Sequence, residues 1–263
     1  MTTLSLKILD KNGNTLAVAN GEDFVDLVYT REYVEGDRIE LQSSKKNIHI
    51  NWQVDDALGK SFVYFTDTEN YVIPFGEKRI ALSPKVFCGN RHYLFAEVAS
   101  DDETYMYRNL ALNPADQHKD VNVYPHAWAN VETRGESVFE ARNAIDGVRA
   151  NLSHGEWPYE SWGINRQDDA FMHIDFGREI EVDKIVLYTR SDFPHDNWWK
   201  EATVKFSDGT KEVFGLEKTE KAHEIPISTR RIVWLELCEL IKADDPSPFP
   251  ALTQIEVYGR VVR

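Results

Sequence analysis

The stretch ATVKFSDGTKEVFGL, residues 202–216, decides the fold class. Its two ends are short runs with β-branched and aromatic residues, and Asp208-Gly209 lies between them. An Asp-Gly pair between two such runs is a strong signal for a tight hairpin turn, because the turn positions need positive φ angles. The stretch therefore predicts two antiparallel strands joined by a hairpin turn at Asp208-Gly209.

The chain after residue 104 repeats this pattern at short intervals, and helical periodicity is almost absent. Further strands are expected at MHIDFG (172–177), VDKIVLYTR (182–190), HEIPI (223–227), RRIVWLELCEL (230–240) and TQIEVYGRVV (253–262). The best candidate for a helical turn is SVFEARNAIDG (137–147). Many short strands with regular turns predict a sandwich or jelly roll rather than a strand–helix–strand fold.

The first part of the chain has the same character. Strands are expected at LSLKIL (4–9), DRIELQ (37–42), IHINWQV (48–54) and SFVYFT (61–66). The short acidic stretch SDDET (100–104) interrupts the pattern and is the expected boundary between domains. The sequence therefore predicts an all-β protein with two β-sandwich domains, residues 1–104 and residues 105–263.

The charge of the chain argues against some classes of partner. The formal net charge is −14, and both domains have more acidic than basic residues. Neither domain offers a positive field for phosphates, so nucleic acid is not an expected partner. No apolar run approaches the ~18 residues of a membrane span. The first residues lack the pattern of a secretion signal, so we expect a cytoplasmic protein if this start is native. The sequence does not indicate an oligomeric state.

An ordered series of motifs in the second domain carries a family resemblance. The series is RNLALN (108–113), ARNAIDG (141–147), a Trp-bearing loop, HIDFG (173–177), IVLYTR (185–190), VKFSDG (204–209) and QIEVYG (254–259). It is similar to the galactose-binding-like domain, also called the discoidin or coagulation factor type C domain, a fold that many carbohydrate-binding modules share. The resemblance implies a jelly roll of about eight strands, with ligand-binding loops at one end.

The resemblance also implies a structural cation. Domains of this family often bind calcium with an Asp in the A-x-DG turn, backbone carbonyls and a Glu of the last strand. The matching residues are Asp146 and Glu256. Oxygen ligands suit a hard cation, and such a site would close a loop onto the terminal strand. The alternative is that Asp146-Gly147 is only a turn and that Glu256 faces solvent.

Two loops contain the residue types that sugar recognition needs. They are NLSHGEWPYESWGIN (151–165) and RSDFPHDNWWK (190–200). Trp offers a flat apolar platform to a pyranose ring, and Arg, His, Asp and Asn offer planar donors and acceptors. The candidate ligand-binding residues are His154, Trp157, Asn165, Arg190, Asp192, His195, Asp196 and Trp198.

Structural roles compete with these assignments. Adjacent side chains of a strand point to opposite faces, so one of Trp198 and Trp199 is expected in the core and the other along the ligand site. Trp162 is expected in the core as well. In a third loop (124–136), Glu132 and Arg134 are interpreted as a structural pair rather than as ligand contacts.

These features favour a non-catalytic carbohydrate-binding protein. No nucleophile elbow, zinc-protease motif or phosphate-binding loop is present in the sequence. The first alternative is a glycoside hydrolase that uses acids and histidines of the same cleft. The second alternative is a protein-interaction module, because one fold supports several functions. An enzyme is expected to have a buried pair of carboxyl groups with separated pKa values, which a binder should lack. An interaction module is expected to have an exposed apolar patch of several hundred Å².

Overall fold

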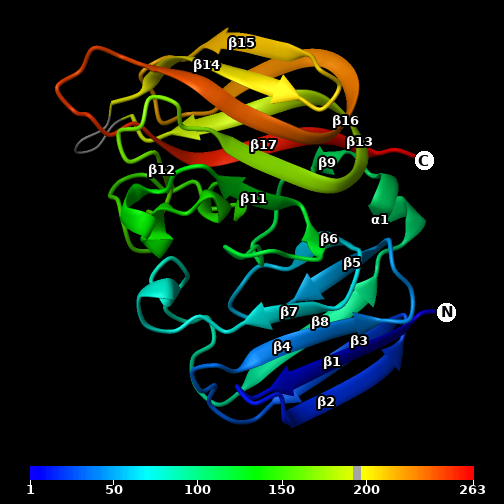
Figure 1. Cartoon of the computed structure of the whole chain (residues 1–263). Helices are drawn as coiled ribbons and strands as arrows, with labels where there is room; N and C mark the ends of the chain where they lie inside the picture. Colours follow the sequence, from blue (N-terminus) through cyan, green and yellow to red (C-terminus); the bar gives the residue numbers. More distant parts are fainter. Residues whose placement is uncertain (192–196) are drawn as a thin grey trace.

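The computed structural model describes residues 1–191 and 197–263 and is built mainly of antiparallel strands (Figure 1). The first strands form the lower body in this view and the last strands the upper body. The prediction of an all-β fold is confirmed. Within the described residues, no helix is long and apolar enough to cross a membrane.

The N-terminal domain consists of two sheets with one core between them. One sheet has the order β2 (Thr15–Glu22), β1 (Thr3–Leu9), β4 (Arg38–Ser43), β7 (Glu69–Val72). The other has the order β10 (Val123–Tyr124), β6 (Ser61–Phe65), β5 (Ile48–Gln53), β8 (His92–Val98), β3 (Phe24–Tyr29). The alternation in LSLKIL buries Leu4, Leu6 and Ile8 completely, as period-2 patterning requires.

The C-terminal domain is an antiparallel sheet that curves round a second core. The path of the sheet is β12 (Trp162–Gly163), β17 (Ala251–Val261), β13 (Met172–Thr189), β16 (His223–Lys242), β14 (Trp199–Phe206), β15 (Lys211–Gly215). In addition, β11 (His126–Ala129) pairs with β13, and β9 (Arg108–Asn109) pairs with β17. Register shifts interrupt the pairing of β13 between Asp175 and Lys184, and the strand pairs with β11 before them and with β17 from Ile180 on.

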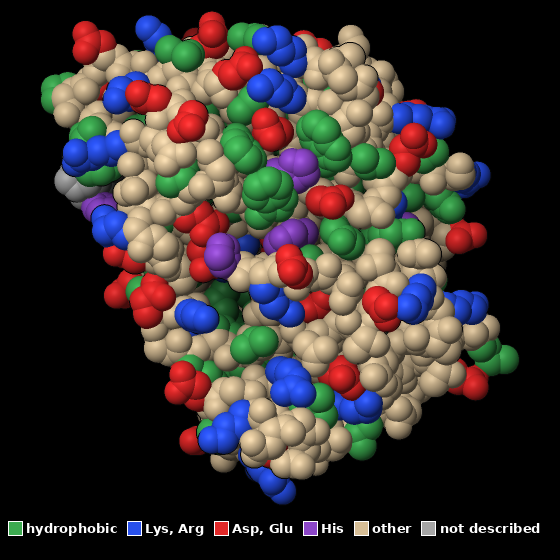
Figure 2. Space-filling model, in the orientation of Figure 1, with side chains coloured by type: hydrophobic (Ala, Val, Ile, Leu, Met, Phe, Trp, Pro, Cys, Tyr) green, Lys and Arg blue, Asp and Glu red, His purple; other side chains and the backbone are tan. Residues whose placement is uncertain are grey.

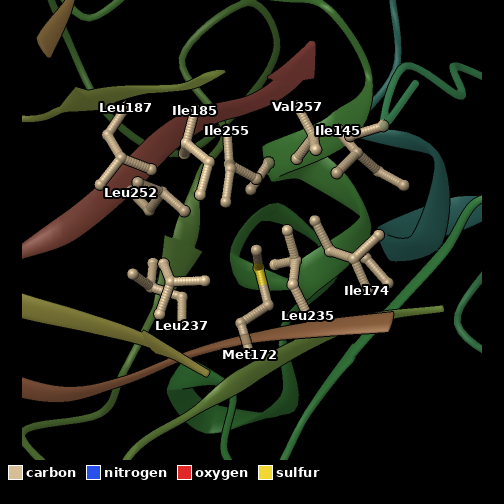
Figure 3. Packing of buried hydrophobic residues seen from close by; sticks show 14 of the residues in the cluster. Ile145, Met172, Ile174, Ile185, Leu187, Leu235, Leu237, Leu252, Ile255 and Val257 are labelled. Atoms are coloured by element: carbon tan, nitrogen blue, oxygen red, sulfur yellow. The ribbon is translucent and has the colours of Figure 1, made fainter. Parts of the chain in front are cut away.

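The core of this domain is formed by alternate residues of its three long strands. Figure 3 shows the side chains of Ile174 and Leu235 meeting those of Ile255 and Val257, with Ile145 closing one side. All five are fully buried. Burial of aliphatic side chains stabilises the fold by about 25 cal/mol for each Å² of apolar surface removed from water. This core fixes the strand ends, and the loops extend from those ends.

The two most local predictions are confirmed. Residues 202–216 form the hairpin β14–β15, in which Gly209 has a φ of +84° and the Thr210 N–H donates to the Asp208 carboxylate at 2.9 Å. The expected helical turn consists of two short 3-10 helices, η3 (Ser137–Phe139) and η4 (Ala141–Ile145).

The stretch between the two cores contains a short helix and residues that pack into the N-terminal core. Residues 101–105 form helix α1 (Asp101–Tyr105), which begins with a capping box between Ser100 and Glu103. Beyond the helix, Ala115 and Val123 still pack into the N-terminal core, and β10 joins the N-terminal sheet. The chain therefore crosses between the two cores over a segment that continues past residue 104.

Candidate functional site

The loops at one end of the C-terminal domain enclose a cleft of about 740 Å³. This volume lies in the ~300–1,000 Å³ range of small-molecule sites. The described lining comes from segments 133–139, 153–166 and 249–251, together with Arg190 and with Ile80 of the N-terminal domain. We call this space the cleft. In Figure 2, charged side chains of both signs are interspersed over the face in view, and histidines gather near its middle.

The position of Trp157 in the cleft is fixed by its backbone. The Gly155 N–H donates to the Tyr159 carbonyl at 3.2 Å, and the Tyr159 N–H donates to the Glu156 carbonyl at 3.0 Å, which closes a tight turn. The Trp157 N–H donates to the carbonyl of Ile80 at 2.9 Å. Trp157 is 38% exposed and lines the cleft. A turn held in this way loses little backbone freedom when a ligand stacks on the indole.

Asn165 and Arg166, further along the same segment, adopt an uncommon backbone conformation. Their φ angles are +49° and +63°, a region that few non-glycine residues adopt. The Asn165 N–H donates to the Thr133 Oγ1 at 3.0 Å, and the Arg166 guanidinium lies 4.4 Å from the centre of the Phe249 ring. Backbone strain of this kind is often found at functional sites. All four residues line the cleft.

A glycine makes the close approach of these segments possible. A Cβ at Gly163 would lie 2.6 Å from the Thr133 Oγ1 and 3.2 Å from the Phe139 ring. Thr133 and Phe139 belong to the segment that lies beside the loop. Any larger residue at position 163 would therefore push apart the two segments that line the cleft.

Arg134 also lines the cleft, and its partner differs from the predicted one. Its Nε and Nη2 donate to the Glu136 carboxylate at 2.5 and 2.6 Å, and the guanidinium lies 5.4 Å from the Phe139 ring centre. The predicted pairing of Arg134 with Glu132 is wrong. Glu132 accepts from the Ala141 N–H at 2.8 Å and pairs with the His118 imidazole at 3.0 Å, because the loop turns back after residue 132.

Arg190 lies at the wall of the cleft but is only 2% exposed. Its guanidinium donates to the Tyr159 carbonyl at 3.2 Å and to the Ser153 carbonyl. These bonds hold the ends of the turn that presents Trp157. His154, another predicted residue, lies in this turn and lines the cleft. The structure therefore brings four of the predicted ligand residues together: His154, Trp157, Asn165 and Arg190.

The remaining predicted ligand residues are placed differently. Asp192, His195 and Asp196 lie outside the described residues. Trp198 is half-buried beneath the Lys218 ammonium, 5.0 Å from its ring centre, and is not among the described residues that line the cleft. Trp199 lies in the core, 1% exposed, with its ring centre 6.2 Å from that of Trp162. The predictions that one Trp of the pair and Trp162 are core residues are confirmed.

Sequence reasoning missed several residues of the lining. Arg134, Arg166, Phe249 and Ile80 were not assigned to the site, although each faces the cleft. Of these four, Phe249 was the easiest to predict from the sequence, because prolines flank it directly before the last strand. The other three depend on positive φ angles or on contacts between distant segments.

The residues expected to bind calcium are already engaged with protein groups. Glu256 is buried, pairs with Arg149 and accepts from the Tyr258 hydroxyl at 3.0 Å. The Gly147 N–H donates to the Gln254 amide oxygen at 3.1 Å, so the turn does lie against the terminal strand. In residues 1–191 and 197–263, no group of three or more His, Cys, Asp or Glu side chains could hold a metal ion. Calcium at Glu256 would have to compete with the Arg149 guanidinium for the carboxylate.

One pair of carboxyl groups has perturbed acidity. Burial raises the pKa of Glu160 and of Asp146, and the two groups interact with each other. Neither is among the described residues that line the cleft. Within the cleft, the hydrogen bonds from Arg134 lower the pKa of Glu136. The structure therefore contains a buried carboxyl pair of the kind expected of an enzyme, although Glu160 lies between two lining residues, Tyr159 and Ser161, and is not itself part of the described lining.

The chain is similar to some solved structures at low sequence identity. No protein-family model and no curated protein matches the chain. Among solved structures, the chain is similar to chitosan-binding module 1 of a chitosanase/glucanase from Paenibacillus sp. IK-5, with 18% identity over 57% of this chain and 98% of the module and a TM-score of 0.40. It is also similar to the family 32 carbohydrate-binding module of C. perfringens NanJ in complex with galactose (14% identity, 58% and 99% of the two chains, TM-score 0.42).

A third similar structure is a fucose-binding module of Streptococcus pneumoniae, with 13% identity over 57% of this chain and 96% of the module and a TM-score of 0.39. These neighbours are carbohydrate-binding modules, the class that the resemblance implied. At such TM-scores the likeness is too distant to assign a ligand, so the function has to follow from the residues of the cleft.

Proposed function

We propose that the chain binds a carbohydrate in the cleft and does not change it chemically. The observation that carries the proposal is the arrangement of Trp157 with Arg166 and Asn165. An exposed indole, fixed at its backbone, lines the same cleft as a guanidinium and an amide. Stacking on the ring and hydrogen bonds to planar donors are the interactions that a pyranose offers.

The expected affinity is modest. A site of this kind combines one stacking ring with a few hydrogen bonds, and solvent competes for both. We expect a Kd between about 1 μM and 1 mM, which corresponds to roughly −8 to −4 kcal/mol. Preorganisation favours the upper end of the affinity range, because Trp157 and Asn165 are held by hydrogen bonds to Ile80 and Thr133 before a ligand arrives.

The glycoside hydrolase alternative finds less support among the described residues. A glycosidase needs a protonated acid and a second carboxylate on either side of the bond to be broken. The described cleft carboxylates are Glu136 and Glu156. Glu136 is ion-paired with Arg134, and this pair favours the ionised carboxylate. Glu136 is therefore unsuited to act as a general acid. Asp146 and Glu160, which have raised pKa values, are not part of the described lining.

The test is a glycan array probed with the whole chain, together with a panel of chromogenic glycosides. Binding of defined glycans without release of the chromophore is the expected result. Release of the chromophore would establish the hydrolase instead. A chain that neither binds any arrayed glycan nor hydrolyses any glycoside would exclude a glycan site and favour the interaction module.

A further inference from the structure

A short turn of the N-terminal domain reaches the cleft. This turn consists of η1 (Gly76–Arg79) and Ile80. In Figure 1 it is the cyan turn at the left of the lower body, directed toward the green loops of the upper body. Ile80 is 38% exposed and lines the cleft, although it belongs to the other domain. An isoleucine that served only to pack the two domains together would be buried between them.

The same turn holds both loops that line this side of the cleft. The Ile80 carbonyl accepts from the Trp157 N–H at 2.9 Å. The Glu77 carboxylate accepts from the Ser137 N–H at 2.8 Å and from its hydroxyl at 3.0 Å, and the Glu77 carbonyl accepts from that hydroxyl at 2.7 Å. Ser137 is 2% exposed, so these bonds are shielded from water. The turn therefore sets the separation between Trp157 and the 137–139 segment.

We propose that residues 76–80 are part of the carbohydrate site, with Ile80 as an apolar wall and Glu77 as a positioning residue. This inference rests on the proposed function. Because Ile80 is bonded to the Trp157 backbone and lines the same cleft of about 740 Å³, a second sugar attached to one stacked on Trp157 would have Ile80 as an apolar surface to contact. The ligand class is thus an oligosaccharide that spans the two domains, and a single terminal sugar fills only part of the cleft.

The first test measures how affinity depends on glycan length. The probes are arrayed mono-, di-, tri- and tetrasaccharides that share the terminal sugar the chain binds. The variant is Ile80→Ala. The matched control is Val28→Ala, which removes a branched side chain that is 58% exposed on β3 of the same domain. The native chain should bind the tri- and tetrasaccharides at least about tenfold more tightly than the monosaccharide, the ratio that 1.4 kcal/mol of added contact produces.

Ile80→Ala should reduce the ratio of tri- or tetrasaccharide affinity to monosaccharide affinity about threefold or more. It should leave monosaccharide binding and the melting temperature unchanged. Val28→Ala should change neither the affinity ratio, nor monosaccharide binding, nor the melting temperature. Equal affinity of the native chain for all lengths, or an unchanged ratio in Ile80→Ala, overturns this inference and leaves the proposed function standing. Failure of the native chain to bind any glycan overturns both, so the two failures are distinguishable.

The second test measures the positioning role of Glu77 without a ligand. Glu77→Gln keeps the side-chain shape but replaces a charged acceptor by a weaker neutral one. Amide hydrogen exchange of peptides covering 137–139 and 153–159 should speed up about threefold or more, while the melting temperature stays within a few degrees. Glu97→Gln, exposed on β8, is the control. Unchanged exchange in Glu77→Gln would show that the turn does not hold the loops.

Discussion

The backbone N–H of Asn165 donates a 3.0 Å hydrogen bond to the Oγ1 of Thr133, and this bond joins two segments of the cleft lining. It fixes the backbone exactly where two consecutive non-glycine residues, Asn165 and Arg166, have positive φ angles. A conformation of this kind persists only where the surroundings hold it. Thr133 is therefore expected to support Arg166 through the backbone rather than by contact with the ligand.

Thr133→Val tests this support. Valine has the shape of threonine but cannot accept a hydrogen bond, so the free energy of unfolding should fall by about 1 kcal/mol. Glycan affinity should fall by up to about fivefold, which is the ratio that 1 kcal/mol produces. Thr133→Ser keeps the hydroxyl and should retain both properties. Chemical denaturation and titration with an arrayed glycan measure the two effects, and equal behaviour of the two variants would contradict the supporting role.

Trp157→Ala tests the indole platform, and the chain contains a matched control. Trp157 and Trp128 are 38% and 41% exposed, but only Trp157 is among the described residues of the cleft. Trp128 instead stacks on His173 across β11 and β13, with ring centres 5.0 Å apart. Trp157→Ala should weaken glycan binding tenfold or more, a loss of about 1.4 kcal/mol or more. Equal losses in Trp157→Ala and Trp128→Ala would remove Trp157 from the site.

The parts of the fold that depend on local chemistry were predictable from the sequence. Asp208-Gly209 forms a hairpin because the turn needs residues that tolerate positive φ, and Gly209 supplies one. The adjacent tryptophans differ in burial because successive residues of a strand face opposite sides, which places Trp199 in the core and leaves Trp198 half-buried. Alternation and turn chemistry involve neighbours in sequence, so they can be read without the structure.

The parts of the site that depend on distant partners were not predictable. Ile80 reaches the cleft through a bond to Trp157, 77 residues later by residue number, and Glu256 meets Arg149 across the fold. The alternate positions of Glu132 and Arg134 favoured Glu132 as the partner, but in the structure Arg134 pairs with Glu136. Selecting among several nearby acids requires the path of the chain. Sequence therefore identified the loop that carries Trp157, but not the residues that come to it from elsewhere.

The ion pair of His118 with Glu132 predicts a dependence of stability on pH. The hydrogen bond to Glu132 raises the pKa of His118 to about 9, above the ~6.5 of an unfolded chain. Because the folded pKa is the higher one, the stabilisation is fully present below about pH 6.5 and is lost as the pH rises through about 9. His118 is largely exposed, so solvent screening limits the effect to ~0.2–1 kcal/mol.

The measurement is the difference in unfolding free energy between the native chain and His118→Gln at several pH values. The native chain should be the more stable at pH 6, and the difference should shrink toward zero near pH 10. Glutamine stays neutral throughout, so the variant supplies the reference for other titrating groups. A difference that is constant from pH 6 to pH 10 would contradict a charged pair between His118 and Glu132.

The last prediction concerns the competition between Arg149 and calcium for Glu256. The Glu256 carboxylate is buried, and its positive partner in the structure is the Arg149 guanidinium. Arg149→Ala should lower the free energy of unfolding by roughly 1–3 kcal/mol, because it removes a charged hydrogen bond from a buried acceptor. A cation that binds only the folded state stabilises it by mass action, so millimolar calcium should restore part of the melting temperature in this variant.

Thermal melts in EDTA and in calcium decide the outcome, with magnesium as the control ion. The control variant is Arg260→Ala, which changes an exposed arginine of β17, the strand that carries Glu256. The native chain should melt at the same temperature in EDTA and in calcium, because Arg149 already neutralises Glu256. Calcium should raise the melting temperature of Arg149→Ala alone. A native chain that loses several degrees in EDTA and contains calcium by elemental analysis would show that the cation binds beside Glu256 despite the ion pair. In that case Arg149 would lie beside the bound cation rather than take the place of a cation.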